Sequence, residues 1–235
     1  MSFKLQTFIK ERFKQNVFTG LPLTIFIIVF MILLGTLIGI TESIVNSLPI
    51  VKVDENFANF LYHLRTPFLA QVFYNITHIA DQITVIILGA GALIYLFLKK
   101  EIAYLYALIL IFFGTEASVY LIKIIINRPR PIVDIAYYIE TSQSFPSGHA
   151  TIAMAFFGFV TYYLIHHSAM RNKRSIILVL GTLLVILIGF SRLYLGVHFL
   201  SDVLGGFLIG GLWLVVGITF RERHFYNSSL KKGVS

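Results

Sequence analysis

Long apolar runs, separated by short clusters of charged residues, proline and glycine, set the pattern of this chain. Each run approaches the roughly 20 residues that an α-helix needs to cross the hydrocarbon core of a bilayer. None of them shows the polar stripe that a helix of a soluble protein turns toward water. The pattern therefore predicts six transmembrane helices. We expect them at residues 21–43, 75–98, 102–126, 146–165, 175–193 and 199–220.

The N-terminal segment is basic and amphipathic, with apolar side chains at helical spacing. It lacks the long apolar core and the small-residue cleavage site of a signal peptide, so we expect a helix that lies on the membrane surface. The predicted fold class is all-α, an integral membrane bundle of six transmembrane helices with an N-terminal interfacial helix. We expect one membrane domain over 1–235, with the interfacial helix at 1–18, the six-helix core at 21–220 and a tail at 221–235.

Composition agrees with a membrane protein, because 57% of the residues are hydrophobic and only 13% are charged. A soluble domain is usually about one quarter charged. The net charge of +8 does not indicate nucleic-acid binding, since the basic residues flank the predicted spans, where they act as topology signals. The chain has no cysteine, which excludes disulfides, thiolate zinc sites and cysteine nucleophiles.

The distribution of lysine and arginine predicts the orientation in the membrane. If both termini are cytoplasmic, all but six of the 19 basic residues lie in inside segments, as the positive-inside rule requires. The six that remain on the outer half are Lys52, Arg65, Lys123, Arg128, Arg130 and Arg192. The last four of these lie at span ends, where charge is costly and usually functional. We therefore expect a multi-pass cell-membrane protein with both termini cytoplasmic, including the 221–235 tail.

Three polar motifs interrupt the apolar pattern, and the expected topology brings all of them to the outer face. They are K-x6-R-P at 123–131, P-S-G-H at 146–149 and S-R-x5-H-x3-D at 191–202. Taken singly, each has a structural interpretation. A cation can anchor a span end, and proline with serine can start a helix.

Together the motifs are more specific, because they combine positive charge with a helix N-terminus. Lys123, Arg130 and Arg192 contribute three cations. The helix that starts at 146–149 would direct backbone N–H groups of Ser147, Gly148 and His149 toward an anion, and its dipole would add to the attraction. This combination predicts a site for a multiply charged tetrahedral anion, most simply phosphate.

A candidate for chemistry lies in the third motif. His198 and Asp202 are four residues apart, so that on one helix they would share a face. The aspartate can bond one ring nitrogen and leave the other as a free lone pair, which is the role of an acid beside a catalytic histidine. The sequence shows no cluster of carboxylates fit to hold Mg²⁺. We therefore expect neither a metal nor another cofactor.

In their order and spacing, the three motifs resemble the signature of the type-2 phosphatidic acid phosphatase superfamily, which includes integral membrane lipid phosphatases. No signature position departs from the pattern. The motifs cover 123–202, about a third of the chain, and the six-helix pattern extends the likeness to nearly all of it. The resemblance implies that His198 is the nucleophile, Asp202 its orienting partner and His149 the general acid. The phosphate-binding residues that it implies are Lys123, Arg130, Ser147, Gly148 and Arg192.

The implied reaction is hydrolysis of a lipid phosphate or pyrophosphate monoester through a phosphohistidine, at the extracytoplasmic face. Candidate substrates are phosphatidylglycerophosphate, phosphatidic acid and undecaprenyl pyrophosphate. The expected partners are this substrate and membrane lipids, without nucleic acid, and the oligomeric state stays open. One alternative is a lipid phosphotransferase that uses the same phosphohistidine. A transporter is a remote alternative, because transporter charges usually lie near the midplane on broken helices within inverted repeats.

Other polar residues lie near the predicted site. Glu116 is an intramembrane acid about two helical turns before Lys123, and we interpret it as a possible partner of a cationic residue. His78 and Asp81 could line an entrance or satisfy each other. Glu140, with neighbouring tyrosines, could touch a lipid headgroup.

Two further segments are open to more than one interpretation. The outer loop at 44–74 is long enough for a short amphipathic helix, and could be a lid over the site or a cover for span ends. The glycine pairs at 205–206 and 210–211 indicate close helix packing.

Overall fold

A computed structural model describes residues 18–47, 49–132, 135–167 and 173–232, and in these ranges all regular structure is helical. The interfacial helix expected at 1–18 lies outside the described residues, except for Phe18. In chain order the elements are α2 (Leu21–Val45), α3 (Pro49–Leu64), α4 (Pro67–Thr77), the 3₁₀ turn η1 (His78–Ala80), α5 (Gln82–Leu98), α6 (Ile102–Ile126), α7 (Gly148–Ile152), the π-helical turn η2 (Ala153–Phe157), α8 (Gly158–His166), α9 (Arg174–Tyr194) and α10 (Leu200–Lys232).

The helices form an integral membrane bundle, which confirms the predicted class. In the described part of the chain, five helical segments are long and apolar enough to span a membrane on their own. They are Leu21–Val45, Ile102–Ile126, Gly148–His166, Arg174–Tyr194 and Leu200–Ser228. A sixth span exists only if α4 with η1 and α5 are counted together, because the two halves are bent by 42°.

Two of the predicted spans differ from straight helices. The span expected at 75–98 is broken at Asp81, whose extended backbone (φ −64°, ψ 150°) ends η1 and precedes α5. The span expected at 146–165 contains the π-helical turn η2 between α7 and α8. Such turns widen a helix locally and are frequent near functional sites.

The last helix is longer than the apolar run that predicts it. We expected it to end near residue 220, but α10 continues to Lys232 and includes much of the predicted tail. The run of polar residues after residue 220 therefore marks where the chain leaves the apolar zone, and not where the helix stops. Polar residues with good helix propensity can extend a helix into water.

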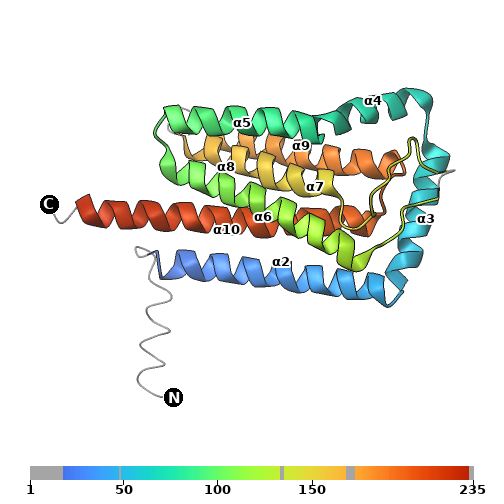
Figure 1. Ribbon diagram of the computed structural model, residues 1–235, viewed down its shortest axis with the longest axis horizontal. Helices are drawn as coiled ribbons and strands as arrows, with labels where there is room; N and C mark the ends of the chain where they lie inside the picture. The colour runs from blue at the N-terminus through green and yellow to red at the C-terminus, as the bar shows by residue number, and fades with distance from the viewer. Residues whose placement is uncertain (1–17, 48, 133–134, 168–172, 233–235) are drawn as a thin grey trace, which may run out of the picture.

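Helix α10 packs against α2, α6 and α7, and α3 lies across one end of the bundle (Figure 1). Close approach of α7 depends on glycines of α10. A Cβ atom at Gly206 would lie 2.6 Å from the carbonyl oxygen of Ser147, and one at Gly210 would lie 2.4 Å from that of Thr151. This confirms the close packing that these glycines predict. The close packing also holds the first residues of α7 against the first turns of α10.

Candidate active site

The three polar motifs meet at the end of the bundle that α3 crosses (Figure 1). Local sequence explains why the helices stop there. Helix α6 ends at Asn127 in a left-handed conformation (φ 45°), and the Arg128-Pro129 sequence that follows disfavours further helix. The turn between α9 and α10 contains Gly196 at φ 69°, where a Cβ atom would lie 2.5 Å from the carbonyl oxygen of Ile135. Only glycine fits this turn without strain.

His198 lies in that turn and is almost fully buried, with 2% of its surface exposed. Its Nε2 atom is 3.2 Å from a guanidinium nitrogen of Arg130. Its Nδ1 atom is 3.5 Å from Oδ2 of Asp202, close enough for an ion pair but not aligned as a hydrogen bond. The two residues do not share one helix as expected, because α10 begins only at Leu200. They still meet, since the turn folds back over the first residues of α10.

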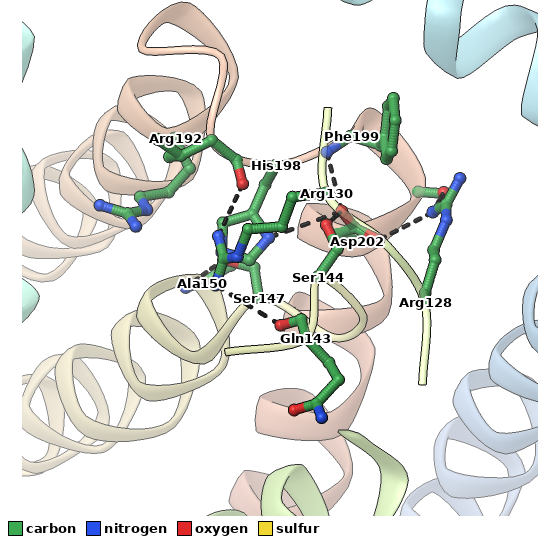
Figure 2. Close-up of polar contacts among 12 residues, drawn as sticks. Arg128, Arg130, Gln143, Ser144, Ser147, Ala150, Arg192, His198, Phe199 and Asp202 are labelled. Atoms are coloured by element: carbon green, nitrogen blue, oxygen red, sulfur yellow. Dashed lines mark hydrogen bonds and ion pairs between the residues drawn. The ribbon is translucent and has the colours of Figure 1, made fainter. Parts of the chain in front are cut away.

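Asp202 is fully buried and holds this turn in place (Figure 2). Its Oδ2 atom accepts hydrogen bonds from the backbone N–H of Phe199 at 2.8 Å and from the hydroxyl of Ser144. Its Oδ1 atom forms an ion pair with Arg128 at 2.7 Å. Asp202 is thus itself oriented by three donors before it can orient His198.

Arg128 is a residue of the site that the motifs do not identify. Besides Asp202, it contacts Asp54 at 2.7 Å and donates a hydrogen bond to the hydroxyl of Ser201. Asp54 comes from α3 and is 1% exposed. One role of the 44–74 segment is therefore to deliver a buried carboxylate that anchors Arg128. Its position partly indicated a role, because Arg128 is one of the cations at a span end.

Two of the three candidate phosphate-binding cations contact a carboxylate, that of Glu140. Glu140 forms ion pairs with Arg130 at 2.7 Å and with Arg192, which is fully buried. Burial alone would raise the pKa of Glu140, but Arg192 and Arg130 together lower its pKa to about 2. Glu140 is therefore anionic at neutral and mildly acidic pH. Lys123 donates a hydrogen bond to the carbonyl oxygen of Gln143.

The helix N-terminus at α7 is only partly available to an anion. The backbone N–H of Ser147 donates to the carbonyl oxygen of Asp202 at 3.0 Å, and its hydroxyl caps the helix by accepting from Ala150. Gly148 and His149, in contrast, line the cavity that is described below. Both belong to the first turn of α7, where backbone N–H groups lack partners within the helix. Two of the three expected N–H donors are thus free to face a ligand.

His149 has a partner that the sequence did not indicate. Its Nε2 atom lies 2.8 Å from Oδ1 of Asp81, which stands at the break between η1 and α5. The expected contact between His78 and Asp81 also occurs, at 3.5 Å. Each of the two histidines therefore has a carboxylate beside its ring, Asp81 for His149 and Asp202 for His198.

Replacing Asp81 by asparagine should lower kcat by about tenfold to a hundredfold with little change in KM. The carboxylate fixes the ring of His149 and favours its protonated form, and a positioned general acid is worth about 10²–10⁴ in rate. Steady-state kinetics on a lipid phosphate measure both constants. The matched control is His78→Gln, which should stay within about twofold of wild type. Equal losses in the two variants would show that Asp81 only closes the helix break.

His198 should stay neutral in mildly acidic solution. Burial lowers the pKa of His198, and the nearby charges of Arg130 and Arg192 lower it further. At pH 6.5 a histidine with an ordinary pKa would be half protonated, whereas His198 should be neutral and keep its nucleophilic lone pair. Nitrogen NMR of labelled histidines, with His198→Gln to identify the signal, measures the titration. A midpoint at or above about 6.5 would contradict this expectation.

A cavity of about 600 Å³ connects these residues to apolar walls. Its polar end is formed by Lys123, Arg130, Glu140, His149 and His198, and its apolar part follows α5 and α6 as far as Leu93 and Phe112. Glu116 also lines it and makes no ion pair or hydrogen bond with any described residue. Glu116 therefore makes no direct contact with a cationic residue of the described part of the chain.

The cavity has the shape and chemistry for a ligand with an anionic head and an apolar tail. Within the ranges that the structure describes, no group of three or more histidine, aspartate or glutamate side chains is placed to hold a metal ion. The arrangement of His198, His149 and the cations supports nucleophilic attack on an anionic ligand.

Comparison with known proteins gives a consistent result. Residues 100–226 match the sequence profile of the PAP2 superfamily. Phosphatidylglycerophosphatase B of Bacillus subtilis (strain 168) is 33% identical over 195 residues, which cover 79% of this chain and 93% of that protein. An undecaprenyl-diphosphatase of Sulfolobus acidocaldarius is 37% identical over 90 residues, 37% of this chain and 39% of that protein.

A solved structure agrees in fold. The crystal structure of a transmembrane PAP2-type phosphatidylglycerolphosphate phosphatase from Bacillus subtilis superposes with a TM-score of 0.73 at 30% identity. The match covers 83% of this chain and 96% of that one.

Proposed function

Since this chain belongs to the PAP2 superfamily of metal-independent membrane phosphatases, we propose that it removes a terminal phosphate from a membrane lipid through a phosphohistidine at His198. The preferred substrate in this proposal is phosphatidylglycerophosphate, and the reaction takes place at the extracytoplasmic face. The similarity to a phosphatidylglycerophosphatase extends over 79% of this chain, whereas the similarity to the undecaprenyl-diphosphatase extends over only 37% of it. This difference supports phosphatidylglycerophosphate over a prenyl diphosphate as the substrate.

One observation carries the proposal. The buried ring of His198 lies between Asp202 and Arg130, at the polar end of a cavity whose remaining walls are apolar. A histidine that only stabilised the fold would not need to line a cavity beside two cations, Lys123 and Arg130. A phosphate monoester on a lipid fits this arrangement, because its head needs the cations and its acyl chains need the apolar walls.

In the first step, Nε2 of neutral His198 attacks phosphorus while the bond to the lipid oxygen breaks. Asp202, held by Arg128, stabilises the proton on Nδ1 as positive charge develops on the ring. Arg130, Arg192 and Lys123 neutralise the phosphoryl oxygens, which is the main requirement of phosphoryl transfer. Protonated His149 gives its proton to the departing alkoxide.

In the second step, a water molecule attacks the phosphohistidine. His149, now neutral, takes a proton from that water, and the bond between phosphorus and Nε2 breaks. The products are inorganic phosphate and a lipid with a free hydroxyl, and His198 and His149 return to their starting states. If a lipid or sugar hydroxyl replaced the water, the same intermediate would give a transferase.

A panel of lipid phosphates tests the substrate. Purified protein in detergent, with EDTA present, should release inorganic phosphate from phosphatidylglycerophosphate faster than from phosphatidic acid or undecaprenyl pyrophosphate. Phosphate appearing only on an added alcohol would establish a transferase instead. Activity that needed added Mg²⁺ would contradict the proposed roles of the three cations.

The proposed face of the membrane is tested by cysteine labelling, which the absence of native cysteine makes simple. Asn56 is exposed on α3, at the end of the bundle that carries the site, and Lys99 is exposed after α5, at the opposite end. In intact cells, an impermeant maleimide should label Asn56→Cys and should label Lys99→Cys only after lysis. The reverse pattern would place the active site in the cytoplasm.

A further inference from the structure

Glu140 lies where the phosphate of a substrate is expected. Its carboxylate bridges the guanidinium groups of Arg130 and Arg192, two of the three candidate phosphate-binding cations. It lines the same cavity as His149 and His198. With 22% of its side chain exposed, it is open to the cavity and is not sealed in the protein.

The other donors of these cations also point at protein acceptors. Arg130 donates to the carbonyl oxygen of Ser142 at 2.6 Å and to its hydroxyl at 3.0 Å, and Lys123 donates to the carbonyl oxygen of Gln143. These acceptors lie two and three residues after Glu140 in the chain. The segment 140–143 thus wraps the cationic end of the cavity, and Glu140 is its one carboxylate.

The contacts of Arg192 leave one of its hydrogen-bond donors without an acceptor. Its Nη1 atom donates to Thr77 and Tyr138, and its Nη2 atom to Glu140. Its Nε atom has no hydrogen-bond partner among the described residues, although the side chain is fully buried. A buried guanidinium donor without an acceptor is costly. Glu140 therefore leaves one donor of Arg192 unsatisfied.

A carboxylate and a phosphate make the same charge-assisted contacts with guanidinium groups. They cannot occupy one pair of arginines together, because two anions in contact repel each other strongly at low dielectric. Phosphate has three free oxygens and up to two charges, so it can replace Glu140 and also reach Lys123 and the first turn of α7. An anion with a single charge has less to gain from the exchange.

We propose that Glu140 is an internal competitor of the substrate phosphate. It holds Arg130 and Arg192 in the empty enzyme, swings out when a phosphate monoester enters, and returns when inorganic phosphate leaves. It sets specificity for dianionic monoesters over singly charged diesters, and it weakens product inhibition. This inference rests on the proposed function and adds a role for a residue outside the three motifs.

The test is the affinity for inorganic phosphate, measured by calorimetric titration of the full chain in detergent. Glu140→Gln keeps the size of the side chain and removes its charge. It should bind phosphate about tenfold tighter or more, since removing one close ion-pair competitor has an effect of this order. In turnover, the same variant should show a lower KM and stronger inhibition by phosphate. Glu140→Asp keeps the charge and should stay within about threefold of wild type.

The opposite outcome is equally clear. If Glu140 only holds the arginines in position, Glu140→Gln should bind phosphate with unchanged or weaker affinity, and the inference is then wrong. Glu140→Ala is the second variant, with the same expected tightening, should the glutamine form not fold. Because the titration needs no turnover, the two proposals fail separately. A wild-type protein that releases no phosphate from any lipid overturns the function, whereas an active one without tightening overturns only the competitor.

Discussion

Replacing His198 by glutamine should lower the rate of phosphate release by about four orders of magnitude or more. The imidazole is the only group of the protein that bonds to phosphorus in the proposed mechanism, and removing a nucleophile usually costs at least this much. Binding should persist, because Arg130, Arg192 and Lys123 remain. The expected signature is therefore loss of kcat with an affinity for inorganic phosphate close to that of wild type, measured by phosphate-release kinetics and by titration.

His63→Gln provides the matched control, since His63 is exposed on α3 and does not line the cavity. It should keep wild-type activity within about twofold. A His198→Gln protein that retained more than about a tenth of the activity would show that another group attacks phosphorus. Loss of phosphate binding together with activity would show that His198 serves binding rather than chemistry.

Replacing Arg128 by alanine should lower the melting temperature by about 10 °C and lower kcat by about a hundredfold. Its removal leaves two buried carboxylates, Asp202 and Asp54, without their shared counter-charge. Breaking a buried ion pair in this way costs about 3–5 kcal/mol, and in a chain of this size each kcal/mol shifts the melting temperature by about 2–4 °C. Activity falls as well, because Asp202 no longer holds His198 in place.

Two comparisons make this result specific. Arg223→Ala changes an exposed arginine of α10 far from the site, and should shift the melting temperature by less than about 2 °C. A double-mutant cycle of Arg128→Met with Asp54→Asn measures the coupling directly. Adding Asp54→Asn to Arg128→Met should restore part of the stability, because it removes one of the stranded charges. Independent, additive effects would show that the two residues do not form the pair.

The parts of the fold that can be predicted are those that a single segment determines. An apolar run fixes a span by its own length, and α6 and α9 lie within one residue of the predicted bounds. The three motifs indicated the cations and both histidines as candidate site residues, because polar and charged residues are rare in the apolar sequence of a membrane protein. The bend at Asp81 was missed, because an aspartate after an apolar stretch is as compatible with a helix end as with a break.

The parts that could not be predicted are pairs between distant segments. Arg128 meets Asp54 across 74 residues, and His149 meets Asp81 across 68. Neither spacing is periodic, so nothing local indicates that the residues are partners. Glu140 illustrates the same limit, because nothing near it in the sequence indicates that it lies between Arg130 and Arg192.

The most direct test of the central claim is to trap the covalent intermediate. Wild-type protein mixed with phosphatidylglycerophosphate carrying a radiolabelled terminal phosphate, in EDTA, is quenched within milliseconds in alkali and digested for peptide mapping. The account predicts an acid-labile label on His198 that is absent from His198→Gln. Label on any other residue, or turnover without a labelled protein, would contradict it.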